Sequence, residues 1–175
     1  MTVNTKEFSA KQEKMVADFM GWKVVTGSGS RPFTPGDVNS YDFLVECKTH
    51  ITAQDKIVFR KAHWKKISSE AMSKHRYPVL ITDDGTQKAG NTWVMIPRRM
   101  LTSESSLGIF GSWWDKSRSD NLISLSTKTA PHLCNTVQAA PGIKFIYLAA
   151  QFDSEELAIM PLETFRQLCS EDFGV

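Results

Sequence analysis

The stretch from Gly36 to Lys48 constrains the fold most, because it places charged side chains on an otherwise apolar strand. Side chains alternate between the two faces of a strand, so Glu46 and Lys48 share one face. The other face is apolar and suited to a core, and it carries Phe43, Val45 and Cys47. A buried charged pair is costly unless it is partnered or bound to a metal ion. The pattern therefore predicts a strand with one core face and a charged pair that needs a partner.

Asp37 precedes this strand, directly after Gly36. If its own strand pairs with the one that carries Glu46, two carboxylates and the Lys48 ammonium converge. Carboxylates suit Mg²⁺, and a lysine can lie against a phosphate or an attacking water. This combination is typical of a site that cleaves phosphodiester bonds. The alternative is a solvated strand face, which is the common role of so short a pattern.

Composition and length indicate one sizeable globular domain. The chain has 175 residues, of which 41% are hydrophobic and 23% charged. No apolar run approaches the roughly 20 residues of a membrane span, and the N-terminus has no signal-peptide pattern. The three cysteines are scattered and fit neither a disulfide framework nor a zinc site. We therefore expect a protein of the reducing cytoplasm with no membrane partner.

Charge is distributed unevenly, although the net charge is only +2. From Lys48 to Arg76, eight basic residues face two acidic ones, whereas the segment from Asp153 onward is strongly acidic. A basic region beside the candidate site fits a polyanion. A lysine-rich, solvated helix face would give the same pattern, and charge alone leaves both interpretations open.

Local patterns predict alternating helices and strands, hence an α/β fold. A helix is expected over residues 9–20, with Ser9 as N-cap, Gln12 as its capping-box partner and Gly21 as its end. An amphipathic helix is expected over residues 61–75. Pro97 and Pro161 are each expected to open a helix. Strands are expected over residues 22–26, 57–59, 78–82, 92–96, 122–125, 143–148 and 157–160.

Three further features have two interpretations each. Residues 27–36 are rich in glycine and serine, so they form either a loop that contacts a substrate phosphate or a plain linker. Glu13 lies near the buried edge of the first helix, or it is a surface residue paired with Lys11 or Lys14. Trp113 and Trp114 stand among basic residues and either stack on bases or form a small satellite core.

An ordered series of motifs resembles Holliday-junction resolvases of the archaeal and phage type, members of the PD-(D/E)XK nuclease superfamily. It comprises Lys11–Lys14, Val16–Ala17, Gly27–Ser30, Gly36–Val38, Phe43–Thr49, Trp64–Ile67, Glu70–Ala71 and Pro78–Leu80, and it covers roughly residues 8 to 82. The resemblance implies a restriction-endonuclease-like core within residues 1–97. That core is a small mixed β-sheet flanked by helices. Residues 98–175 match nothing in the pattern, and we expect them to form a C-terminal α/β extension packed on the same domain.

The resemblance also implies a site and an activity. Mg²⁺, for which Mn²⁺ can substitute, would be held by Glu13, Asp37 and Glu46, with Lys48 beside the attacking water. Ser28 or Ser30 would approach the scissile phosphate. Arg31, Lys61 and Lys65 are the further candidates for substrate binding.

The expected function is metal-dependent cleavage of branched DNA by a homodimer in the cytoplasm, which would be the host's cytoplasm if a phage encodes the chain. Gly36 departs from the proline of the superfamily's name. Two alternatives remain: a restriction-type or nicking endonuclease that reads sequence, and a nucleic-acid-binding module without chemistry.

Overall fold

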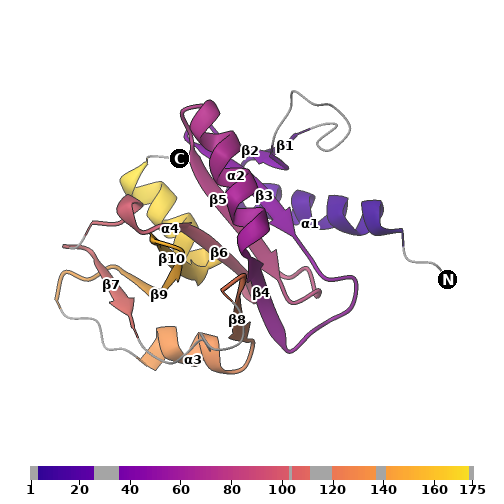
Figure 1. Ribbon diagram of the computed structural model, residues 1–175. Helices are drawn as coiled ribbons and strands as arrows, with labels where there is room; N and C mark the ends of the chain where they lie inside the picture. Colours follow the sequence, from indigo (N-terminus) through magenta and orange to yellow (C-terminus); the bar gives the residue numbers. More distant parts are fainter. Residues whose placement is uncertain (1–3, 26–35, 103, 111–119, 137–140, 174–175) are drawn as a thin grey trace.

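The protein is built around one eight-stranded mixed β-sheet with helices on both faces (Figure 1). The computed structural model describes residues 4–25, 36–102, 104–110, 120–136 and 141–173. The sheet has the order β1-β2-β3-β5-β6-β10-β9-β7, and β4 and β8 form a separate two-stranded sheet. An α/β fold with a mixed sheet between helices is therefore confirmed.

The strands are β1 (Lys23–Val24), β2 (Val38–Asn39), β3 (Phe43–Lys48), β4 (Lys56–Arg60), β5 (Tyr77–Asp83), β6 (Thr92–Pro97), β7 (Ser106–Ile109), β8 (Leu122–Ser126), β9 (Phe145–Phe152) and β10 (Glu155–Pro161). The helices are α1 (Thr5–Met20), α2 (Lys61–Ser73), α3 (Thr129–Thr136) and α4 (Leu162–Asp172), with short 3₁₀ turns η1 (Ala89–Asn91) and η2 (Arg98–Met100). Among the described residues, no helix is long and apolar enough to span a membrane.

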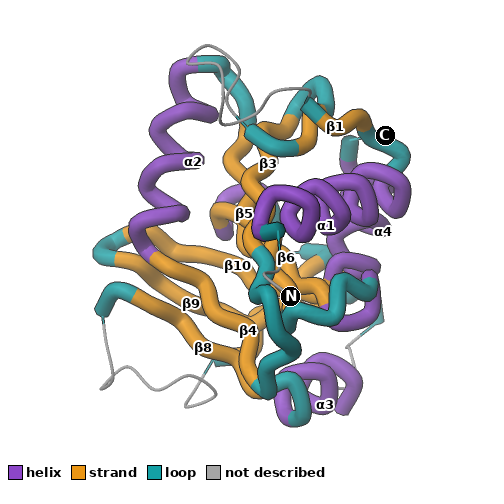
Figure 2. The backbone as a smooth tube through the Cα atoms, turned by 90° about the vertical axis from the view of Figure 1, so that its right-hand side faces the viewer, coloured by secondary structure: helices purple, strands orange, loops and turns teal. Residues whose placement is uncertain are grey.

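Each face of the sheet has its own core. Helices α1 and α4 cover one face, where Val16 and Phe165 pack with Val45 and Ile81. Helix α2 and the β4–β8 pair cover the other face, where Trp64 and Ile67 of α2 pack with strand residues such as Leu80 and Met95. Figure 2 shows α1 and α4 together on one side of the strands and α2 on the opposite side.

The sheet is larger than expected because the C-terminal segments extend it. Strand β10 pairs antiparallel with β6, with Leu157 opposite Pro97 and Pro161 opposite Trp93. These two segments are similar in sequence, Trp-Val-Met-Ile-Pro and Leu-Ala-Ile-Met-Pro, and each carries its proline at the end. Strands β9 and β7 then follow β10 in the sheet. Strands β7, β9 and β10 therefore continue the same sheet, whereas β8 pairs with β4 in the two-stranded sheet.

The first helix begins earlier than its sequence suggests. It starts at Thr5, and Asn4 is the N-cap, with its side chain accepting a hydrogen bond from the Lys6 amide. The prediction that Ser9 caps this helix is therefore wrong, because Asn4 offers an equally good cap one turn earlier. The predicted end at Gly21 is confirmed: its φ of 71° is left-handed, and its amide bonds the Ala17 carbonyl.

Most other elements appear where they are predicted, with exceptions in the second half. Helix α2 is confirmed, and its apolar face of Trp64, Ile67 and Ala71 is buried. Pro97 ends β6 and caps only the 3₁₀ turn η2, so the α-helix expected there is absent. Pro161 caps α4. The patterns missed β7 and α3, and residues 113 and 114 lie outside the described part of the chain.

Candidate active site

Strand β3 presents Glu46 and Lys48 at its C-terminal end, on the face that α2 covers. Leu44 of the same face belongs to the core around Trp64. Phe43, Val45 and Cys47 alternate with these residues and are buried in the opposite core. The predicted division of this strand into a core face and a charged face is confirmed.

Asp37 stands beside Glu46 because β2 pairs antiparallel with β3. Val38 lies opposite Val45 in this register, so Asp37 is one step further along, next to Glu46. The Asp37 amide donates to the Val45 carbonyl at 2.7 Å. Its carboxylate Oδ2 accepts a hydrogen bond from the Cys47 amide at 2.8 Å. These two bonds fix both the backbone and the side chain of Asp37 at the end of the ladder.

Glu46 is a buried carboxylate held by two lysines. It is only 4% exposed, and its Oε1 lies 2.5 Å from Nζ of Lys48 and 3.3 Å from Nζ of Lys66. Burial opposes ionisation, but the lysines outweigh it and lower the pKa of Glu46 below its usual value. The pKa of Lys48 is raised, since the partner carboxylate outweighs the effect of burial. Both groups are therefore charged at neutral pH.

Helix α1 brings a third carboxylate to this cluster. The pKa of Glu13 is raised to about 7, mainly by burial and secondly by the neighbouring Asp37 carboxylate. Glu46 adds to this effect, and Lys48 opposes it. Lys14 lies 2.8 Å from Asp18 instead of pairing with Glu13. Glu13 is thus half-buried among the other candidate residues, as the helix pattern suggested.

Gln12 ties α1 to the end of β3. Its side chain is fully buried, and Nε2 donates to the Lys48 carbonyl at 2.8 Å. Its Oε1 is buried and has no hydrogen-bond partner in the described part of the chain. Sequence reasoning assigned Gln12 to a capping box and missed this role, and only its place beside Glu13 offered a signal.

The loop that follows Lys48 is anchored by a buried acid. Asp83 is fully buried, and its Oδ1 accepts from Thr49 Oγ1 at 2.6 Å and from the Gly85 amide at 2.9 Å. Burial raises the pKa of this carboxyl above its usual value. The sequence showed Asp83 only as part of a turn, so its structural role was not foreseen.

His63 of α2 was also missed. It is half-buried, and its pKa is lowered by that burial and by the nearby Lys48 ammonium. The imidazole is therefore neutral at physiological pH. A neutral imidazole near two lysines and a carboxylate can accept a proton or a hydrogen bond.

The remaining candidates fall into two groups. Lys61 and Lys65 both contact the Asp153 carboxylate, and the Lys65 distance is 3.1 Å. Their charge is thus partly compensated by the turn between β9 and β10. Ser28, Ser30 and Arg31 lie outside the described residues.

The donor chemistry of the cluster fits a hard divalent cation. Glu13, Asp37 and Glu46 supply carboxylate oxygens, which Mg²⁺ prefers. The pKa of Glu13 is raised mainly by burial and then by the Asp37 carboxylate, and a cation would offset the second of these effects. Within the described ranges, however, no group of three or more His, Cys, Asp or Glu side chains is arranged to hold a metal ion. Glu46 instead faces two ammonium groups, so a cation would have to share the Glu46 carboxylate with Lys48 or displace Lys48 from it.

Comparison with protein-family models, with curated proteins and with solved structures gives no match to this chain.

Proposed function

We propose that the protein is a metal-dependent DNA endonuclease that selects branched DNA. The observation that carries the proposal is the group of Asp37, Glu46 and Lys48 at the end of β3, with Glu13 of α1 near enough to interact electrostatically with all three. The same proposal includes a restriction-endonuclease-like core. It also includes membership of the nuclease superfamily that the motifs resemble.

The residues of the cluster have separable roles in this proposal. Glu13, Asp37 and Glu46 would hold Mg²⁺, which supplies Lewis-acid activation of water and of the phosphate. Lys48 keeps its charge at neutral pH and would stabilise the negative charge that develops on the phosphate oxygens during attack. Without the ion the pKa of the Glu13 carboxyl is about 7, so this group would release its proton on binding Mg²⁺. Asp37 is oriented by the Cys47 amide.

Selection of branched DNA implies a particular assembly. Resolution of a four-way junction requires cuts in two opposed strands, and a two-fold homodimer places two identical sites for them. DNA as substrate, and a second copy of this chain as partner, are both part of the proposal. The resemblance of residues 8 to 82 supports them.

A second candidate function follows from the ion pairs of Glu46. With Lys48 and Lys66 both on this carboxylate, the cluster is already neutralised in part without any cation. Such a site would serve a nucleic-acid-binding module without chemistry. Strong DNA binding with no cleavage in Mg²⁺ or Mn²⁺ would favour this module over the nuclease.

One panel of substrates tests the proposal. The protein is incubated with a labelled four-way junction and a linear duplex of matched sequence, in Mg²⁺, in Mn²⁺ and in EDTA. We expect symmetric cuts in the junction, little cleavage of the duplex and none in EDTA. Cleavage of both substrates at one base sequence would indicate the restriction-type or nicking alternative. No cleavage in either metal would refute the nuclease.

A further inference from the structure

A cavity lies far from the carboxylate cluster, at the other end of the β3–β5 ladder. It has a volume of about 620 Å³, which is in the range of small-molecule sites. Tyr77, on its wall, pairs with Phe43 at the start of the ladder, whereas Lys48 pairs with Thr82 at the end. Five residue steps of about 3.3 Å each separate the two places by roughly 17 Å. The proposed nuclease activity makes no use of this cavity.

One part of the wall is apolar and partly open to solvent. Met72 of α2 is 77% exposed and Tyr77 is 40% exposed, and Pro78 lies beside them. The Tyr77 ring is braced by Phe43 and Phe173, at centroid distances of 6.3 and 6.0 Å. Through these contacts the ring lies on the α4 side of β5, whereas Met72 and Pro78 lie on the α2 side. The fixed and partly exposed Tyr77 ring offers a flat apolar surface, on which a planar group can stack.

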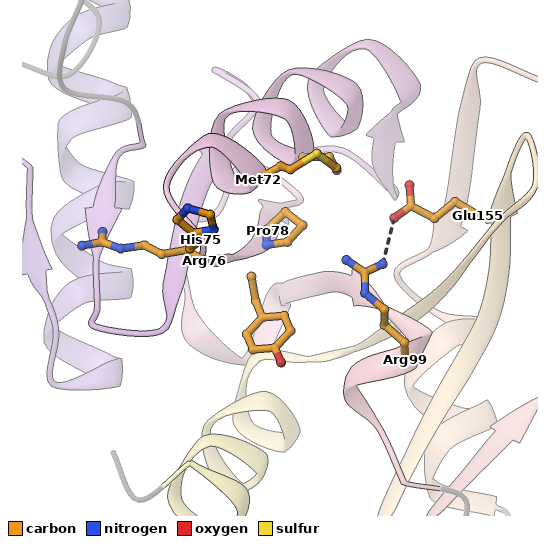
Figure 3. Close-up of a pocket in the computed structure, with 8 residues that line it drawn as sticks. Met72, His75, Arg76, Pro78, Arg99 and Glu155 are labelled. Carbon is orange, nitrogen blue, oxygen red and sulfur yellow. Dashed lines mark ion pairs between the residues drawn. The ribbon is translucent and has the colours of Figure 1, made fainter.

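The opposite part of the wall carries a guanidinium that can be redirected. Figure 3 shows the ion pair between Arg99 and Glu155 on one side of the cavity, with Met72 and Pro78 on the other side. Glu155 is fixed because its Oε2 accepts a hydrogen bond from the buried Trp64 Nε1 at 2.8 Å. Arg99 is largely exposed and lies 3.7 Å from Glu155 Oε1, a distance typical of a weak surface ion pair. An incoming anion can therefore recruit this guanidinium at little cost.

The rim adds two more basic side chains. His75 has a φ of 55°, a left-handed conformation in which glycine is more common, and it follows the end of α2. Non-glycine residues in such conformations concentrate at functional sites. Arg76 comes next, and its guanidinium donates to Asn39 Oδ1. The rim thus holds an imidazole and a second guanidinium, against the single carboxylate of Glu155.

We propose that this cavity binds a nucleoside monophosphate unit, with the base on Tyr77 and the phosphate on Arg99. Planar guanidinium groups bind phosphate through paired hydrogen bonds, and aromatic rings stack on any base. Two sources have this chemistry: a free nucleotide and the phosphorylated end of a nucleic-acid strand. The inference is independent of the nuclease proposal, because it requires neither the carboxylate cluster nor a metal ion.

The test is calorimetric titration in EDTA, which excludes a contribution from metal at the carboxylate cluster. The probes are dAMP, deoxyadenosine and inorganic phosphate. We expect saturable binding of dAMP at millimolar or lower concentration, and weaker binding of each separate part. Arg99→Gln should weaken dAMP binding about tenfold. Arg166→Gln is the control: Arg166 is an exposed arginine of α4 that stacks on Phe19 and does not line this cavity. Its loss should leave the affinity for dAMP unchanged.

Two further measurements make the result decisive. Glu46→Gln should bind dAMP like the wild type, which separates this site from the proposed nuclease centre. A short strand with a 5′-phosphate should compete with dAMP; tighter binding than dAMP identifies the strand end as the ligand, and weaker binding identifies the free nucleotide. The proposal is overturned if dAMP does not saturate, if dAMP binds no better than phosphate, or if Arg99→Gln leaves its affinity unchanged.

Discussion

The amide of Gln12 donates from Nε2 to the main-chain oxygen of Lys48 at 2.8 Å and thereby joins the first helix to the end of β3. Gln12 is fully buried, so the bond is shielded from water. Glu13 is the next residue along the helix, and the bond that anchors Gln12 also determines where Glu13 stands. The position of one carboxylate relative to Lys48 thus depends on a neutral side chain.

Gln12→Leu keeps a similar volume but removes the donor. The Lys48 oxygen then loses its side-chain partner, and the loss of one such hydrogen bond costs about 0.5–1.5 kcal/mol in the free energy of unfolding. Urea unfolding monitored by circular dichroism measures this loss. Gln54→Leu is the matched control, because Gln54 is exposed and its side-chain Nε2 donates to the neighbouring Thr52. Equal effects of the two substitutions would show that the Gln12 bond is unimportant.

The raised pKa of Glu13 predicts how stability depends on pH. Its folded-state pKa of about 7 exceeds the ordinary value of 4.5, so the folded state binds more protons between these values. Stability from this group is therefore present below about pH 4.5 and is lost as the pH rises through about 7. Glu13→Gln should melt higher than the wild type at pH 8, and the gain should vanish at pH 4.5.

Melting curves across this pH range check the sign of the effect. The exposed Glu156→Gln serves as control and should follow the wild type throughout. Mg²⁺ should flatten the wild-type dependence if Glu13 belongs to a metal site, and EDTA should restore it. Parallel curves for Glu13→Gln and the wild type would contradict the burial of this carboxyl.

Gly85 holds the turn after β5 against the loop that follows Lys48. Its φ is 90°, and a Cβ added there would lie 2.5 Å from the Thr52 oxygen. Gly85→Ala should therefore destabilise the protein by more than about 1 kcal/mol, from strain and from the clash. Gly90→Ala is the control, since a Cβ there meets nothing within 4 Å. Similar unfolding midpoints for the two variants would refute this packing.

The local patterns predicted the parts of the fold that depend on neighbours in sequence. Alternation along Phe43–Lys48 and the apolar stripe of α2 were sufficient to predict these two elements and their buried faces. Side-chain direction follows the period of the element, so the buried positions can be read from the sequence. The start of α1 was misplaced because Asn4 and Ser9 are both good caps. A single sequence does not show which of two caps tertiary packing selects.

Long-range pairing could not be predicted in the same way. Nothing local indicates that the segment ending at Pro161 lies beside the one ending at Pro97, although the two are similar. The charge count likewise did not reveal that Asp153 meets Lys61, 92 positions away in the chain. The sequence pointed to the charged residues of the candidate site. It did not point to Gln12 and Asp83, which hold the neighbouring segments in place through hydrogen bonds between distant parts of the chain.

The contact of Asp153 with two lysines predicts a gain of function. In the proposed nuclease, this carboxylate competes with a DNA phosphate for Lys61 and Lys65, with which it forms ion pairs. Asp153→Asn should therefore tighten DNA binding and make it more dependent on salt. The slope of log K against log salt should steepen by up to about 0.9 for each lysine that is released. Fluorescence anisotropy over a salt series measures both quantities. An unchanged slope would show that this face of α2 does not contact DNA.

The double variant Asp153→Asn with Lys65→Gln is the control for this prediction. It should lose part of the gain, because one of the two released lysines is removed. If the double variant binds as tightly as Asp153→Asn alone, the gain does not come from Lys65.

The central claim is that the acids at the end of β3 form a nuclease centre. The most direct measurement is the rate of four-way-junction cleavage in Mg²⁺ by the wild type, Asp37→Asn and Asp18→Asn. Asparagine can still accept the Cys47 hydrogen bond, so Asp37→Asn should fold normally. Asp18 is an exposed acid of α1 that pairs with Lys14. We predict that Asp37→Asn cleaves at least about a hundredfold more slowly while binding the junction, and that Asp18→Asn cleaves like the wild type. Wild-type cleavage by Asp37→Asn would contradict the account.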